Sequence, residues 1–123
     1  MIQTWNEEAN EIAKALRNKL EKKAFEIAKQ YNTILDYKSA IIALDNFIAD
    51  FPGTPYKEQA LYYKLDSAYN LAINSIPSKM QERLVVAKTA HANLVKFNAN
   101  SEFKAKADEM LARIDTDLQQ FSK

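Results

Sequence analysis

His91 is the one histidine of the chain and the first place to look for catalytic or metal chemistry. A metal site needs several convergent ligands, and the sequence has no cysteine and no HExxH pattern that could complete a set around His91. A glycine-rich phosphate-binding loop is excluded as well, because Gly53 is the sole glycine. We therefore interpret His91 as a structural or surface residue and predict no bound metal and no cofactor.

Carboxylates are the other residues that could supply acid or base chemistry. They occur in three groups: Glu7, Glu8 and Glu11; Asp108 and Glu109; Asp115 and Asp117. General acid–base catalysis needs a positioned pair beside a reacting group, and nothing near these carboxylates resembles a nucleophile or an oxyanion hole. We expect solvated helix faces, and we predict that the protein is not an enzyme.

A basic cluster raises the question of nucleic-acid binding; it consists of Arg17, Lys19, Lys22 and Lys23. The cluster is interleaved with Glu21 and Glu26, a mixture typical of i,i+4 pairs along a helix. The net charge of the chain is +1, so no overall field attracts polyanions. We predict no nucleic-acid partner.

Tyrosines are better candidates for binding a partner. Tyr62 and Tyr63 are adjacent, so they point about 100° apart on a helix and cannot both lie in the middle of one buried stripe. Tyr69 follows Tyr62 by seven residues and shares its face. Two interpretations stay open: the tyrosines pack at seams between helices with their hydroxyls wet, or at least one of them, together with Asp66, contacts a protein partner, since tyrosine is enriched in interface cores.

The composition indicates that long helices position these residues. The chain has 123 residues, of which 47% are apolar and 27% charged, with one glycine and three prolines. This is the profile of a soluble globular protein, and we expect residues 1–123 to form a single repeat domain. No apolar run approaches the roughly 20 residues of a transmembrane segment. The acidic start is unlike a signal peptide, so an exported protein would contain this chain as a fragment of a longer one.

Apolar periodicity predicts five helices, at about 5–34, 37–50, 55–74, 79–97 and 102–121. The first is unusually long. The expected N-cap residues are Thr4, Asp36, Thr54, Ser78 and Ser101, with capping boxes at Thr4 and Ser78. Pro55 suits a first helical position, and Gly53 is expected to adopt a positive φ in the turn before it.

An internal repeat with an offset of 47 residues supports this division. It pairs Ala40 with Ala87, Phe47 with Leu94, Thr54 with Ser101, and Tyr56 with Phe103. Each pair lies at the same point of a helix-turn-helix unit, as in a stack of hairpins that bury their apolar faces on one another. The fold class is therefore all-α, an α-solenoid of helical hairpins. We expect one central core, formed by Leu44, Phe47, Leu61, Leu65 and Ala68.

The segment Ala24–Tyr31, followed by Asp36–Ile41 and by Phe51-Pro52, resembles one tetratricopeptide repeat. Three longer segments are similar to the outer-membrane assembly lipoprotein family BamD in its Bacteroidetes form: LRNKLEKKAFEIAKQY, DYKSAIIALDNFIADFPGTPYKEQALYY and AYNLAINSIPSKMQERL. The resemblance covers nearly the whole chain and matches the C-terminal half of the family. The family's N-terminal cysteine and first repeats are absent, and Asn98-Ala99-Asn100 stands where a proline is usual.

This resemblance implies a lipid-anchored scaffold on the periplasmic face of the outer membrane. Its partners would be the POTRA domains of BamA and other subunits of the complex that folds β-barrels. A generic tetratricopeptide-type adaptor of the cell envelope, serving a cell-wall or Tol-Pal complex, is the alternative.

The first half of the long helix has no obvious partner within the chain. Trp5, Ile12, Leu16 and Leu20 form an apolar stripe along residues 5–20, and in the family a preceding repeat would cover it. We expect this half to project from the stack, with Trp5 and Leu16 available to a partner. We also expect the stripe to pack against a second copy of the chain.

Overall fold

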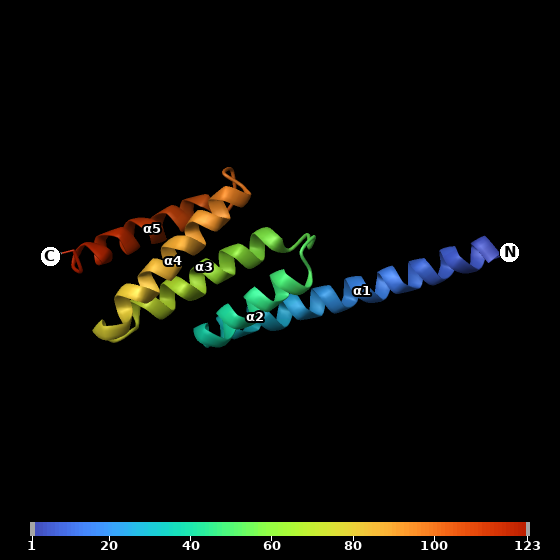
Figure 1. Ribbon diagram of the computed structural model, residues 1–123, viewed down its shortest axis with the longest axis horizontal. Helices are drawn as coiled ribbons and strands as arrows, with labels where there is room; N and C mark the ends of the chain where they lie inside the picture. The colour runs from blue at the N-terminus through green and yellow to red at the C-terminus, as the bar shows by residue number, and fades with distance from the viewer. Residues whose placement is uncertain (1, 123) are drawn as a thin grey trace.

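A computed structural model describes the backbone of residues 2–122 and the side chains of residues 5–122. That range contains five helices and no strand: α1 (Ile2–Thr33), α2 (Tyr37–Asp50), α3 (Lys57–Ile73), α4 (Pro77–Phe97) and α5 (Lys104–Gln119). Each helix packs against its successor, and α3 also contacts α1 and α5. The fold is thus all-α, a tetratricopeptide-like stack of hairpins, and the N-terminal half of α1 extends beyond it (Figure 1).

Asp36 both ends α1 and begins α2. Its backbone N–H donates to the carbonyl of Tyr31 at 2.9 Å, and the N–H of Leu35 donates to Asn32 at 3.1 Å. These two bonds form a Schellman motif, which requires a left-handed residue, and Leu35 accordingly has φ 66°. The Asp36 carboxylate then accepts the N–H of Ser39 at 3.2 Å, which confirms the predicted cap of α2.

The turns before α3 and α5 have the same hydrogen bonds. The hydroxyl of Thr54 accepts the N–H of Tyr56 at 3.1 Å, and the hydroxyl of Ser101 accepts the N–H of Phe103 at 3.1 Å. Both hydroxyl residues are buried. The offset of 47 residues is therefore a structural repeat, and it persists although the second turn has no proline.

The structure corrects the predicted roles of six residues at the helix ends. Helices α3 and α5 begin at residues 57 and 104, two residues later than expected, so Thr54 and Ser101 hold a turn instead of capping a helix, and Pro55 lies in that turn. Helix α4 begins at Pro77, so Ser78 lies inside the helix. No side chain caps α4, because its N-cap residue, Ile76, has no side-chain acceptor.

The other corrections concern Thr4 and Gly53. Helix α1 begins at Ile2, ahead of Thr4, so Thr4 is not its N-cap; the side chain of Thr4 lies outside the described residues. Gly53 does not adopt a positive φ.

The core consists of three clusters instead of the single centre expected. The first joins α1, α2 and α3 around Phe25, Leu44 and Phe47. The second joins α3, α4 and α5 and contains Leu65, with Leu61 partly buried against it. The third lies further along α3 and contains Ala68, Ala72, Leu84, Ala87 and Ile114. The five residues predicted to meet are divided among these clusters, because each hairpin of a stack buries its apolar face on its own neighbours.

Candidate functional site

Tyr62 is part of the packing between α3 and α5. It is buried, and its ring stacks on Phe103 with centroids 4.3 Å apart and an interplanar angle of 12°. Phe25 of α1 stacks on Tyr56 in the same way, at 5.0 Å and 11°. Burial raises the pKa of the Tyr62 hydroxyl, and the Asp66 carboxylate raises it further.

Tyr63 and Asp66 lie at a polar junction of α1 and α3 that we call the α1–α3 seam. It consists of Lys29, Asn32, Tyr63, Asp66 and Ser67. The ammonium of Lys29 lies 5.3 Å from the centre of the Tyr63 ring. The amide of Asn32 donates to the Asp66 carboxylate at 2.8 Å and to the Ser67 hydroxyl at 2.9 Å. Ser67 is fully buried and the other four side chains are half-buried, so the seam presents a cation, an aromatic ring and a carboxylate together.

No sequence pattern identifies Lys29, Asn32 or Ser67 as parts of this seam. Asn32 and Asp66 are 34 residues apart, so no local spacing indicates that they meet.

The remaining candidate residues lie elsewhere. Tyr69 packs against the third core cluster, on the same helix as Tyr62 and Tyr63. Trp5 and Leu16 are exposed on the projecting half of α1, as expected. The structure therefore brings Tyr62, Tyr63 and Asp66 together and separates them from Trp5 and Leu16. Whether these residues bind a partner stays a prediction.

His91 is buried and pairs with one carboxylate. Its Nε2 lies 2.9 Å from Oδ1 of Asp108, which is half-exposed on α5. The repeat places His91 where the first unit has the buried Leu44, which is the sequence signal for its burial. Among the described residues, no group of three histidine or carboxylate side chains could hold a metal ion.

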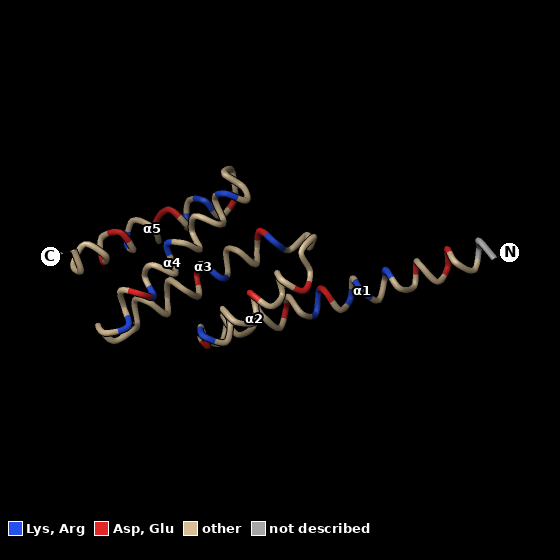
Figure 2. The backbone as a smooth tube through the Cα atoms, viewed as in Figure 1, with Lys and Arg blue, Asp and Glu red and all other residues tan. Residues whose placement is uncertain are grey.

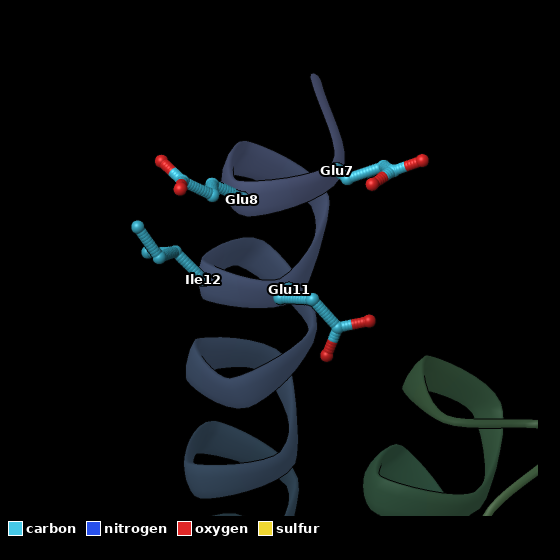
Figure 3. Close-up of a pocket in the computed structure, with 4 residues that line it drawn as sticks. All are labelled: Glu7, Glu8, Glu11 and Ile12. Carbon is cyan, nitrogen blue, oxygen red and sulfur yellow. The ribbon is translucent and has the colours of Figure 1, made fainter. Parts of the chain in front are cut away.

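The other charged groups do not form a cleft either. An open hollow of about 660 Å³ is lined by four residues of one helix: Glu7, Glu8, Glu11 and Ile12. Figure 3 shows Glu7 and Glu11 on one side of that helix and Glu8 and Ile12 on the other, so these residues do not enclose a ligand.

Charges of both signs are interspersed along the helices (Figure 2). Asp115 pairs with Lys88 at 2.9 Å, and Asp117 pairs with Arg113 at 3.0 Å. The i,i+4 pairs expected around the basic cluster of α1 do not form within 4 Å in the part of the chain described. These side chains are exposed, and water competes with such pairs.

The fold defines a helical-repeat protein of the tetratricopeptide-like class. The model of the family YfiO, outer membrane lipoprotein, matches residues 15–121. Because the match covers most of the chain, the protein belongs to the YfiO outer membrane lipoprotein family. No curated protein matches the sequence. Across the described residues, every helix is too short or too polar to cross a bilayer.

Proposed function

We propose that the protein is a non-catalytic scaffold of the machinery that inserts β-barrels into the outer membrane, in the role of the BamD component. The observation that carries the proposal is the family match over residues 15–121, on a chain folded as a stack of hairpins. Such stacks bind other proteins through extended helix surfaces. The scaffold acts at the periplasmic face of the outer membrane, and residues 1–123 form one repeat domain of it.

The partner in this proposal is BamA, through its periplasmic POTRA domains. We assign the contact to the α1–α3 seam, because it combines a half-buried tyrosine with an ammonium 5.3 Å from the ring centre and a carboxylate that accepts a hydrogen bond from Asn32. Aromatic residues dominate the energy of interfaces, and fixed charges set the orientation of the partner. The ring of Tyr62 packs edge-to-face against the ring of Tyr63, with centroids 5.4 Å apart.

The test is titration of the 123-residue chain with purified POTRA domains, followed by calorimetry. Asp66→Asn keeps an oxygen that can accept the bond from Asn32 but removes the charge, so we expect binding about three- to tenfold weaker. Asp115→Asn is the matched control, because Asp115 pairs with Lys88 on another part of the surface. Its binding should equal that of the unmodified chain.

Two results would contradict the proposal. Absence of POTRA binding at high micromolar concentration would exclude the partner. Equal losses for Asp66→Asn and Asp115→Asn would exclude the seam as the contact.

A further inference from the structure

A small apolar groove lies where the three inner helices of the stack meet. Helix α3 packs against both α2 and α4 (Figure 1). Between them is a hollow of about 110 Å³, a volume on the order of one aliphatic side chain. We call it the α2–α4 groove; its walls are Ile41 of α2, Ala68 and Leu71 of α3, and Arg83 and Val86 of α4. Four of these five residues are apolar, so the groove favours an apolar occupant.

Two polar contacts mark the ends of the α2–α4 groove. Lys64 and Ser75 are eleven residues apart on the same face of α3, a distance of about 16 Å. At one end Lys64 forms an ion pair with Asp45 of α2 at 2.6 Å. At the other end Nη1 of Arg83 donates to the hydroxyl of Ser75 at 2.7 Å, and that hydroxyl donates to the carbonyl of Leu71. One end is therefore neutral as a pair, and the other carries a cation.

Arg83 is the unbalanced charge of the groove. Its side chain is half-buried, and within residues 5–122 no carboxylate lies within 4 Å of it. The bond to Ser75 uses one of the five N–H donors of the guanidinium and holds the side chain against the groove. The adjacent Glu82 is exposed and points about 100° away from Arg83 on α4. The remaining donors are therefore available to a carboxylate that approaches from outside.

The walls of the groove favour a helical occupant over an extended one. The walls belong to α2, α3 and α4, whose backbone groups bond to each other within each helix. An extended segment in the groove would therefore leave its own N–H and C=O groups without partners on that side. A helix satisfies its own backbone and presents side chains three or four positions apart on one face, about 5–6 Å from each other. One such side chain can fill the hollow while the next reaches Arg83.

We propose that the α2–α4 groove binds a helix of another protein that carries a leucine or isoleucine and, three or four residues further on, a glutamate or aspartate. The aliphatic side chain enters the hollow between Ile41 and Val86. The carboxylate accepts hydrogen bonds from Arg83 and completes the charge that the chain leaves open. Hydrogen bonds between two charged groups are about twice as strong as neutral ones, so this contact fixes the register of the partner helix.

The groove is separate from the α1–α3 seam. Asp66 of the seam and Ala68 of the groove are two residues apart, so they point about 160° away from each other on α3. A helix in the groove and a POTRA domain on the seam would contact opposite sides of α3. The proposal therefore does not depend on the function proposed above, and Asp66→Asn should leave binding at the groove unchanged.

Nuclear magnetic resonance titration of the ¹⁵N-labelled 123-residue chain tests the proposal. The probe is a synthetic alanine-rich helical peptide with one leucine and, four residues on, one glutamate; the control peptide has glutamine in place of the glutamate. We expect amide shifts at the groove and a dissociation constant on the order of 1 mM, because one side chain and one ion pair make the contact. The glutamine peptide should bind about tenfold more weakly.

Variants of the chain separate the charge from the apolar contact. Arg83→Gln should bind both peptides equally weakly. Arg113→Gln is the matched control, because Arg113 already pairs with Asp117 on α5, and it should keep the preference for the glutamate peptide. Val86→Glu supplies a carboxylate three residues from Arg83 and should abolish binding. Circular dichroism of each variant checks that the helices are retained.

Four results would overturn the proposal. Two concern the charge: equal binding of the two peptides by the unmodified chain, or an unchanged preference in Arg83→Gln. The third is the same set of shifts with 4-methylpentanoate at equal concentration, because a free aliphatic acid would then be sufficient. The fourth is a change of the groove signals when the chain alone is diluted, because the occupant would then be a second copy.

Discussion

Replacing Phe47 with alanine tests the first core cluster most directly. The ring is 2% exposed and lies 5.6 Å from that of Phe25, 5.5 Å from Phe51 and 6.5 Å from Tyr56. Truncating a buried phenylalanine costs about 3–5 kcal/mol, and each lost aromatic pair contributes about 0.5–1.5 kcal/mol beyond area. We therefore expect a loss of about 4–5 kcal/mol in the free energy of unfolding.

Urea denaturation followed by circular dichroism measures this loss. With a slope of about 2 kcal/mol per molar urea, the midpoint should fall by about 2 M. Phe97→Ala is the matched control, because Phe97 is 49% exposed and contacts the ammonium of Lys57 at 5.4 Å. It should cost about 1 kcal/mol or less. A loss below 1 kcal/mol for Phe47→Ala, or equal losses for the two variants, would refute the assignment of Phe47 to the core.

Three further substitutions or titrations probe single contacts. His91→Leu introduces the residue type that the first repeat has at the equivalent position, Leu44. Thermal unfolding should show a free energy of unfolding within about 1 kcal/mol of the original, because the half-exposed carboxylate of Asp108 remains hydrated. A loss above about 2 kcal/mol would contradict this expectation. The pKa of Tyr62 is raised in the folded protein, so its protonated hydroxyl contributes fully to stability below the ordinary tyrosine pKa of about 10. That contribution is lost as the pH rises through the pKa of Tyr62 in the folded protein. Ultraviolet titration should show the ionisation of one phenol above the ordinary tyrosine range. Leu35→Gly should raise the free energy of unfolding by about 0.5–1 kcal/mol, because the exposed Leu35 has a left-handed backbone, with φ 66°, that glycine adopts without strain. A decrease would show that the backbone of Leu35 is not strained.

The number and order of the helices could be predicted from the sequence, because the segments with apolar periodicity are long and few glycines or prolines interrupt them. Helix ends were harder, since a hydroxyl residue has two local uses. Thr54 and Ser101 accept an N–H two residues on and so shape a turn, whereas Asp36 accepts one three residues on and caps a helix. Both uses have the same sequence signature.

The left-handed residue shows a similar limit. Composition favours Gly53 as the residue with a left-handed backbone, because it is the one glycine. The path of the chain out of α1 instead requires this conformation at Leu35. The bonds from Asn32 to Asp66 and Ser67 depend on how α1 lies against α3, and no spacing rule connects residues more than 30 positions apart. By contrast, the burial of His91 could be inferred, because the repeat aligns it with an apolar position.

Helix α1 is a long, uninterrupted helix and is therefore stiff. It has 32 residues, about 48 Å of helix, and no glycine or proline between Ile2 and Thr33 where it could bend freely. The C-terminal half of α1 packs against α2 and α3, and the same half contains Lys29 and Asn32. A tilt of about 10° at this contact would displace Trp5 by roughly 4 Å, since the free arm from residue 20 to residue 5 is about 22 Å long. Small adjustments where α1 meets α3 are thereby magnified at the far tip of the same rod.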